Sequence, residues 1–170
     1  TIAGGVEVAI RRPDGSTFNP QVAVNPIALD SSKDFLYFGA MTGTKLYRIP
    51  TALLRDPKAS SLELANAVEF WAERPISDGI SIDNSGNIYI SALATNEIGV
   101  ILGKDQTYRT LIRDESISWP DAFSFGPDGY MYVAVNQLHK GPLLNAGEDA
   151  SKAPYLIIRF KPLSPGTIGR

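Results

Sequence analysis

Cysteine is absent from the 170-residue chain, which excludes disulfides, thiolate metal sites and a cysteine nucleophile. A long basic block is also missing: 16 lysines and arginines face 18 acidic residues, so nucleic acid is not expected as a partner. The sequence lacks the run of about 18 apolar residues that a membrane-spanning helix needs, and we expect no membrane partner. The single histidine, His139, excludes a histidine-rich metal site. Glycine-rich nucleotide-binding motifs are missing too.

Three segments of the sequence repeat one pattern: residues 25–38, 78–90 and 121–133. Each begins with a polar residue, continues as an alternating apolar strand, and passes through a turn rich in Asp, Asn, Ser, Gly and Pro. Each then enters a strand centred on tyrosine. Alternation of this kind predicts β-strands, and such turns predict hairpins. The segments start 53 and 43 residues apart, which is close to the length of a four-stranded propeller blade, roughly 40–50 residues.

The repeat therefore predicts an all-β chain: a β-propeller of about three four-stranded blades, half of a six-bladed propeller. We expect one partial propeller domain over residues 1–170. The predicted elements are blades at approximately 20–73, 74–114 and 115–162, an N-terminal hairpin at 6–18, short helices near 51–55 and 61–66, and a long loop at 137–153.

A polar residue stands just before the first strand of each blade: Asn25, Asp78 and Asp121. First strands line the central channel of a propeller, so these side chains are expected at one mouth of that channel. Their oxygens suit a hard cation such as Ca²⁺ or Mg²⁺, and two close acids would raise one pKa for acid–base work. The alternative is that they accept backbone hydrogen bonds and only fix the loops. Asn96 and Asn136 are weaker candidates for the same mouth.

Other chemically capable residues carry less weight. Catalysis by His139 is disfavoured, since no Gly-x-Ser-x-Gly elbow accompanies it. Trp71 and Trp119 are interpreted as packing residues between blades rather than as stacking platforms for a ligand.

Several runs resemble the Yellow/major royal jelly protein family, and its bacterial branch most closely. They are residues 25–30, 36–39, 45–51, 54–55, 77–80, 82–83, 96–99, 119–121, 125–130 and 135–139, with the closing Pro154-Tyr155. The resemblance extends over about residues 10–160. It implies a six-bladed propeller, secreted in animals, whose members are linked to dopachrome conversion, to binding of biogenic amines or to nutrition. The resemblance implies a secreted or periplasmic location, and the absence of cysteine, which departs from the animal pattern, counts against the secreted one.

A more distant resemblance is to the gluconolactonase/senescence marker protein propellers. That group holds a divalent cation in the channel with an Asn, an Asp and a Glu. Asn25 and Asp78 fall where the Asn and Asp would lie, whereas the Glu would belong to a blade outside this chain.

Three functions stay open, and whether the chain is an enzyme stays open with them. The first is binding of a small molecule at the channel mouth near Asp121, Asn96 and Asn136. The second is a metal-dependent, lactonase-like hydrolase with Asn25 and Asp78 as ligands and Asp121 as base. The third is a scaffold or nutrient protein. Half a propeller would expose apolar faces, so the missing half is expected from the rest of a longer chain, a companion chain or a second copy.

Overall fold

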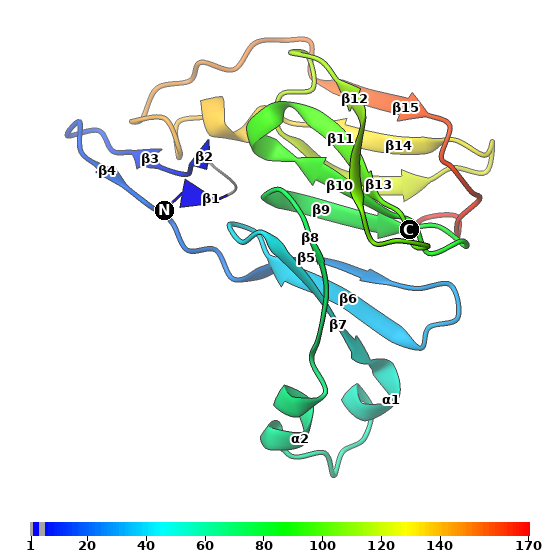
Figure 1. The fold of residues 1–170 in the computed structure, drawn as a ribbon. Helices are drawn as coiled ribbons and strands as arrows, with labels where there is room; N and C mark the ends of the chain where they lie inside the picture. The colour runs from blue at the N-terminus through cyan, green and yellow to red at the C-terminus, as the bar shows by residue number, and fades with distance from the viewer. Residues whose placement is uncertain (1, 4–5) are drawn as a thin grey trace.

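A computed structural model describes residues 2–3 and 6–170 of the chain (Figure 1). Three antiparallel sheets follow one another in chain order. The first contains β5 (Val24–Leu29), β6 (Phe35–Ala40), β7 (Lys45–Pro50) and β8 (Glu69–Glu73). The second contains β9 (Ser77–Ile82), β10 (Ile88–Ala92), β11 (Glu97–Ile101) and β12 (Tyr108–Arg113). The third contains β13 (Pro120–Phe125), β14 (Met131–Val135) and β15 (Leu156–Phe160).

The hairpin turn between the first two strands of each sheet is organised by an aspartate. In the second sheet, a carboxylate oxygen of Asp83 accepts the backbone N–H groups of Ser85 and Asn87 at 2.9 and 3.0 Å. Asp30 and Asp128 accept turn N–H groups in the same way in the other two sheets. The polar turns of the repeat are thus held by local side-chain bonds, as such residues favour.

Two short helices interrupt the first sheet, as the sequence predicts. They are α1 (Thr51–Leu54) and α2 (Ser61–Asn66), and they extend from this sheet away from the other two (Figure 1). Ser60 and Glu63 form a reciprocal capping box that satisfies backbone donors at the start of α2. Among the described residues, no helix is long and apolar enough to cross a membrane.

The core lies between the sheets, which pack face to face. Tyr37 and Leu46 of the first sheet meet isoleucines of the second sheet, including Ile80. On its other face the second sheet packs Tyr89 and Val100 against the third. The repeated tyrosine therefore faces the following sheet in both interfaces, and it is buried in each.

The third sheet has three strands in the described part of the chain, rather than the four of the predicted blade. After β15 the chain turns back towards the inner strands instead of adding an outer strand. Pro165 accepts the N–H of Asn84 at 2.8 Å, and Phe125 exchanges backbone hydrogen bonds with Gly169 and Arg170. The C-terminal segment, residues 163–170, thus ties the ends of β9 and β13 together.

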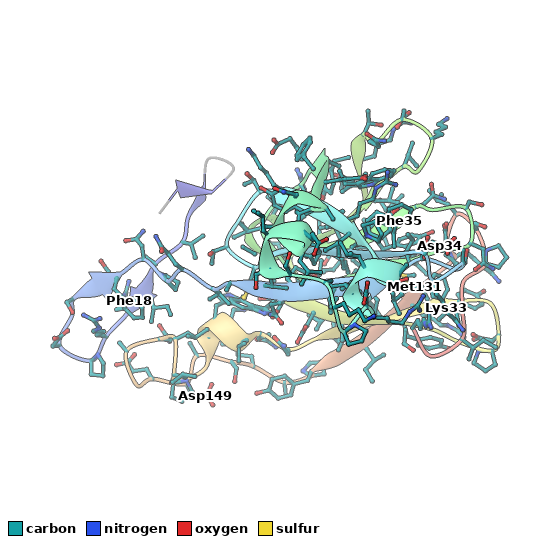
Figure 2. All side chains as sticks on the ribbon, turned by 90° about the horizontal axis from the view of Figure 1, so that it is seen from below. Phe18, Lys33, Asp34, Phe35, Met131 and Asp149 are labelled. Carbon is teal, nitrogen blue, oxygen red and sulfur yellow. The ribbon has the colours of Figure 1, made fainter. Side chains whose placement is uncertain are left out.

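The N-terminal segment forms two short strand pairs. β1 (Ile2–Ala3) pairs with β2 (Val6–Glu7), and β3 (Ile10–Arg11) pairs with β4 (Thr17–Phe18). The predicted hairpin is therefore shorter than residues 6–18, because 6–7 pair with 2–3. The Arg11 carbonyl accepts the N–H of Ala146, so this segment meets the predicted long loop of the third sheet. Figure 2 shows Phe18 and Asp149 of these two segments at the same end of the molecule.

Candidate functional site at the channel mouth

The three predicted axial residues share one backbone feature, a β-bulge in the inner strand. Two residues face one partner residue where the pairing of β5 with β6, of β9 with β10 and of β13 with β14 shifts register. The bulged residues are Asn25–Pro26, Asp78–Gly79 and Asp121–Ala122. They lie inside the strands and not just before them, which corrects the sequence-based placement. A bulge re-aims a side chain, and bulges are over-represented next to active sites.

Asp78 sits at the centre of a polar cluster between the three sheets. Its Oδ1 accepts a short hydrogen bond from the Asn25 side-chain amide. Its Oδ2 accepts the indole N–H of Trp119 at 2.7 Å. The cluster therefore joins the inner strands of the first and second sheets to the residue before the third.

Asp121 forms a second polar pair on the third sheet. Its Oδ2 accepts the Asn136 amide N–H at 2.9 Å, and the Asn136 oxygen accepts the Leu138 backbone N–H at 3.0 Å. Burial raises the pKa of the Asp121 carboxyl, and the nearby charge of Asp78 raises it further, while the bond from Asn136 opposes the shift. The charge of Asp78 is thus the second cause, after burial, that raises the pKa of Asp121.

The bulge at Asp78 is held by buried serines. The Ser91 hydroxyl accepts the Gly79 N–H at 2.8 Å and donates to the Gly79 carbonyl at 3.0 Å, and Ser77 donates to the same carbonyl. A Cβ at residue 79 would collide with the Asp121 carbonyl. Glycine is therefore required here because β13 approaches β9 closely.

Trp119 adopts a left-handed backbone conformation, with φ of 60°, directly before Pro120. Such a conformation is a rare outlier for a bulky residue and costs about 1–3 kcal/mol, so the surroundings must enforce it. The indole stacks on the imidazole of His139, with ring centroids 5.6 Å apart and planes 13° apart. Burial lowers the pKa of His139, and the neighbouring Lys140 lowers it further. A neutral imidazole is therefore favoured in this stack.

A cavity of about 560 Å³ opens beside this aromatic pair. Its lining comes from the N-terminal segment, the ends of all three sheets and the loop of the third sheet. Most of its lining residues are apolar or aromatic, and Arg11 is a charged one; lining residues include Arg11, Val22, Met41, Thr42, Ile76, Leu93, Asn96, Trp119, Leu138, His139 and Asn145. This volume is within the range of small-molecule sites, which are usually apolar with few polar groups.

The predicted site residues divide into two groups. Asn25, Asp78, Asp121 and Asn136 form the hydrogen-bonded clusters described above. Asn96 instead lines the cavity, where it ends the short helix η1 (Leu93–Thr95) in a left-handed conformation that asparagine tolerates.

The aromatic pair of the cavity, Trp119 and His139, was not assigned to the site from sequence. His139 lies in η2 (Leu138–Lys140), and Trp119 stacks on it rather than packing between sheets. Trp71, by contrast, does pack within the first sheet, edge-on to Tyr37 and beneath Arg48. The position of Trp119 directly before Pro120 and Asp121 is the signal that could have found it.

A buried arginine supports one wall of the cavity and was also missed. Arg74 donates to the carbonyls of Ala40 and Pro75, which directly precede the lining residues Met41 and Ile76. Burial lowers its pKa to about 10. Its guanidinium thus fixes two chain segments that shape the cavity.

The axial cluster does not have the donor set of a metal site. Both oxygens of Asp78 face N–H donors, and the Asn25 amide presents its nitrogen and not its oxygen to the carboxylate. Over the described ranges, no group of three His, Cys, Asp or Glu side chains is placed to hold a metal ion. The pair Asn25 and Asp78 therefore does not fit a divalent cation in this arrangement.

Solved propellers share this architecture. Regucalcin from Agrobacterium tumefaciens, a calcium-binding protein, is 16% identical and aligns with a TM-score of 0.59 over 91% of this chain and 52% of its own. A gluconolactonase from Xanthomonas campestris is 11% identical, with a TM-score of 0.59 over 99% of this chain and 57% of its own. A luciferin-regenerating enzyme is 13% identical, with a TM-score of 0.57 over 92% and 52%. At these identities the likeness confirms the predicted β-propeller fold and nothing finer, and the chain spans about half the length of each neighbour.

The sheets thus define a partial β-propeller with a polar cluster at one end of its inner strands. The family model of the major royal jelly proteins matches residues 8–159. The chain belongs to the major royal jelly protein family, as its repeat residues suggested. No curated protein matches the chain in sequence.

Proposed function

We propose that this propeller binds a small organic molecule in the cavity beside Trp119 and His139. The observation that carries the proposal is the cavity of about 560 Å³ with one aromatic wall and a lining of mostly apolar or aromatic residues. A flat molecule with an apolar body would cover the exposed indole face. Asn96, Thr42 and Asn145 would provide the few polar contacts that orient it.

The polar groups of the lining favour a ligand with a hydrogen-bonding group at one end. Arg11, Thr42, Asn96 and Asn145 are the polar residues of the lining, whereas Asp78 is not a lining residue and accepts the Trp119 indole N–H. Aromatic amines combine a ring with such a group, and we propose them as the first ligand class to test.

Tryptophan fluorescence tests the proposal directly, since the chain has two tryptophans and only one lines the cavity. Titration with tyramine is expected to change the emission saturably in the wild type and in Trp71→Phe. The change should disappear in Trp119→Phe. Calorimetry on the same three proteins provides an independent measure of binding.

A titration without saturable signal or heat, repeated with neutral aromatic compounds, would contradict the proposal and favour a scaffold or nutrient role. Turnover of lactones that requires a divalent cation would favour the hydrolase alternative. We also propose that further blades complete a six-bladed ring, whether they come from a longer chain, a companion chain or a second copy.

A further inference from the structure

The Asp78 carboxylate occupies the axial position at which related propellers are expected to hold a cation, yet its surroundings differ from a metal site. We propose that the Trp119 indole N–H takes the place of a divalent cation at Asp78. The charge of this carboxylate would then be satisfied by donors of the protein itself. Asp78 would serve as a positioning residue for Trp119, and the mouth would bind its ligand without a metal.

The first support is the chemistry of the two donors. An indole nitrogen donates only and has no lone pair for a metal. Its hydrogen points at Asp78 Oδ2 over 2.7 Å, in the space that a cation bound to this oxygen would need. Calcium lies 2.3–2.6 Å from its oxygen ligands, so an ion on the lone pair of Oδ2 that accepts the indole N–H would collide with the indole.

The second support is the orientation of the Asn25 amide. Its nitrogen lies within bonding distance of two acceptors, Asp78 Oδ1 and, at 3.7 Å, the Met41 sulfur. Both contacts favour the amide nitrogen over the oxygen at this position. The Asn25 oxygen, which would be the metal ligand, is therefore turned away from the carboxylate.

The third support is that residue Trp119 is held from several sides. Its ring stacks on His139, its carbonyl accepts the Asn136 N–H at 3.2 Å, and Pro120 restricts the chain directly after it. The left-handed backbone of Trp119 is an unfavourable conformation that these contacts and the bond to Asp78 maintain together. A cation at the position of the indole N–H would have to displace this assembly.

The indole N–H resonances test the inference, because the chain has two tryptophans that give two separate signals. In ¹⁵N-labelled protein, Trp119→Phe and Trp71→Phe assign them. Asp78→Ala is expected to shift the Trp119 signal upfield and to raise its hydrogen-exchange rate at least tenfold, with the Trp71 signal unchanged. That unchanged signal also reports that the variant is folded.

A titration with calcium tests the alternative that Asp78 binds a cation. Addition of Ca²⁺ to about 10 mM, well above the dissociation constants of weak protein sites, should leave the wild-type Trp119 signal in place. A saturable shift of that signal by Ca²⁺, abolished in Asp78→Ala, would overturn the inference. So would a Trp119 signal that does not respond to Asp78→Ala. These readouts do not depend on an organic ligand, so their failure is distinct from failure of the proposed function.

Discussion

The middle sheet and the two flanking sheets are built from the same repeat but differ in burial. Every residue of β10 and β11 is buried. In β6 and β14, which occupy comparable places, buried residues alternate with half-buried ones. The middle sheet packs on both faces, whereas each flanking sheet packs on one. The same repeat position is therefore expected to contribute differently to the free energy of unfolding in each sheet, although the sequence pattern is the same.

The two open faces are chemically different from each other. On the first sheet, the register places Ile27, Phe38, Tyr47 and Phe70 in one row across all four strands. Ile27 and Phe70 are more than half exposed. This face is apolar and aromatic.

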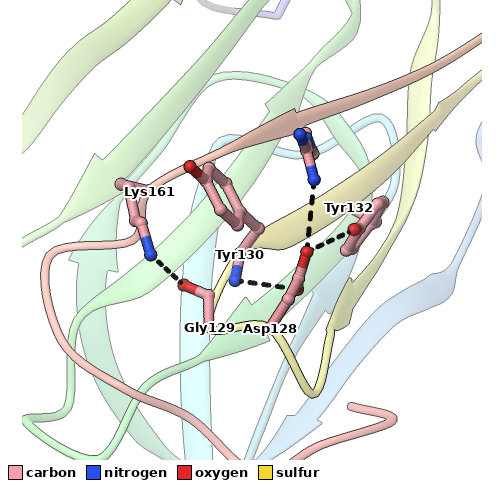
Figure 3. Close-up of polar contacts among 6 residues, drawn as sticks. Asp128, Gly129, Tyr130, Tyr132 and Lys161 are labelled. Atoms are coloured by element: carbon pink, nitrogen blue, oxygen red, sulfur yellow. Dashed lines mark hydrogen bonds and ion pairs between the residues drawn. The ribbon is translucent and has the colours of Figure 1, made fainter.

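On the third sheet, the corresponding surface has charged groups beside Ile157, which is 77% exposed. Asp128 accepts the Tyr132 hydroxyl at 2.7 Å and pairs with Arg159 at 3.3 Å (Figure 3). Arg159 and Lys161 both lie over the ring of Tyr130. Tyr132 occupies the position of Tyr37 and Tyr89, but among the described residues no following sheet covers it.

The largest contrast is expected at Ile80 and Ile27, which are the same residue type at the same repeat position. Ile80 is 8% exposed and Ile27 is 53% exposed. Ile80→Ala should lower the free energy of unfolding by about 2–4 kcal/mol, because it removes buried atoms and leaves a cavity. Ile27→Ala should change it by no more than about 0.5 kcal/mol. Urea denaturation of the isolated chain measures both.

A large loss for Ile27→Ala would indicate that the open face of the first sheet is covered in solution. Repeating the measurement over a range of protein concentrations tests whether a second copy covers this face, because stability would then depend on protein concentration.

Gly79→Ala tests the close approach of the second and third sheets at the mouth. The added methyl would collide with the Asp121 carbonyl, and overpacking of this kind costs about 1–3 kcal/mol. Gly43→Ala is the matched control, because a Cβ there would lie 3.2 Å from the Ala40 methyl at a turn. Thermal unfolding of the two variants should show a clear loss for the first only. Equal losses would mean that the β9–β13 contact is looser than described.

Tyr89→Phe and Tyr132→Phe compare the repeated tyrosine in the covered and open settings. The Tyr89 hydroxyl donates to Asp83 at 2.9 Å and accepts the Leu163 N–H at 2.7 Å, and it is fully buried. Its removal should cost about 1–2 kcal/mol, since two buried partners lose a bond. Tyr132→Phe should cost less than about 0.5 kcal/mol, because its partner Asp128 reaches water. Urea denaturation distinguishes these values through the midpoints, provided that the dependence of the unfolding free energy on urea concentration stays constant. A larger loss for Tyr132→Phe than for Tyr89→Phe would contradict the comparison.

The smallest effect is expected from pH at Asp121, by comparison with Asp121→Asn. The pKa of Asp121 is raised in the folded state from its ordinary value of 3.8. The folded protein therefore binds the proton more tightly than the unfolded chain, and stability falls as pH rises from about 3.8 through the folded pKa. Asp121→Asn should remove this decrease while keeping an acceptor for Asn136. The difference between the two stability–pH curves is the measurement, and parallel curves would show that the environment of Asp121 does not raise its pKa.

Sequence reasoning succeeded where local chemistry determines structure. The turn aspartates Asp30, Asp83 and Asp128 and the repeated tyrosines carry enough local information to place most strands within a residue or two. The helix beginning after Ser60 is equally local, since its capping box is complete within four residues.

The features that were missed depend on contacts distant in sequence. The bulges at Asn25, Asp78 and Asp121 are defined by register with a neighbouring strand, which alternation alone does not specify. Trp119 becomes a site residue only through Asp78 and His139. The third sheet lacks the predicted fourth strand because residues 163–170 bond to β9 and β13 instead.

Because the open faces of the first and third sheets differ, the stack of sheets has two unlike ends. A contact that joins the open face of the first sheet to the open face of the third would be heterologous, so the two partners would contribute different surfaces. Such head-to-tail contacts close into a ring when the rotation per chain is right, and otherwise extend into a filament. The apolar row that ends in Ile27 and Phe70 and the charged groups around Asp128 therefore make the two ends of the sheet stack unlike surfaces.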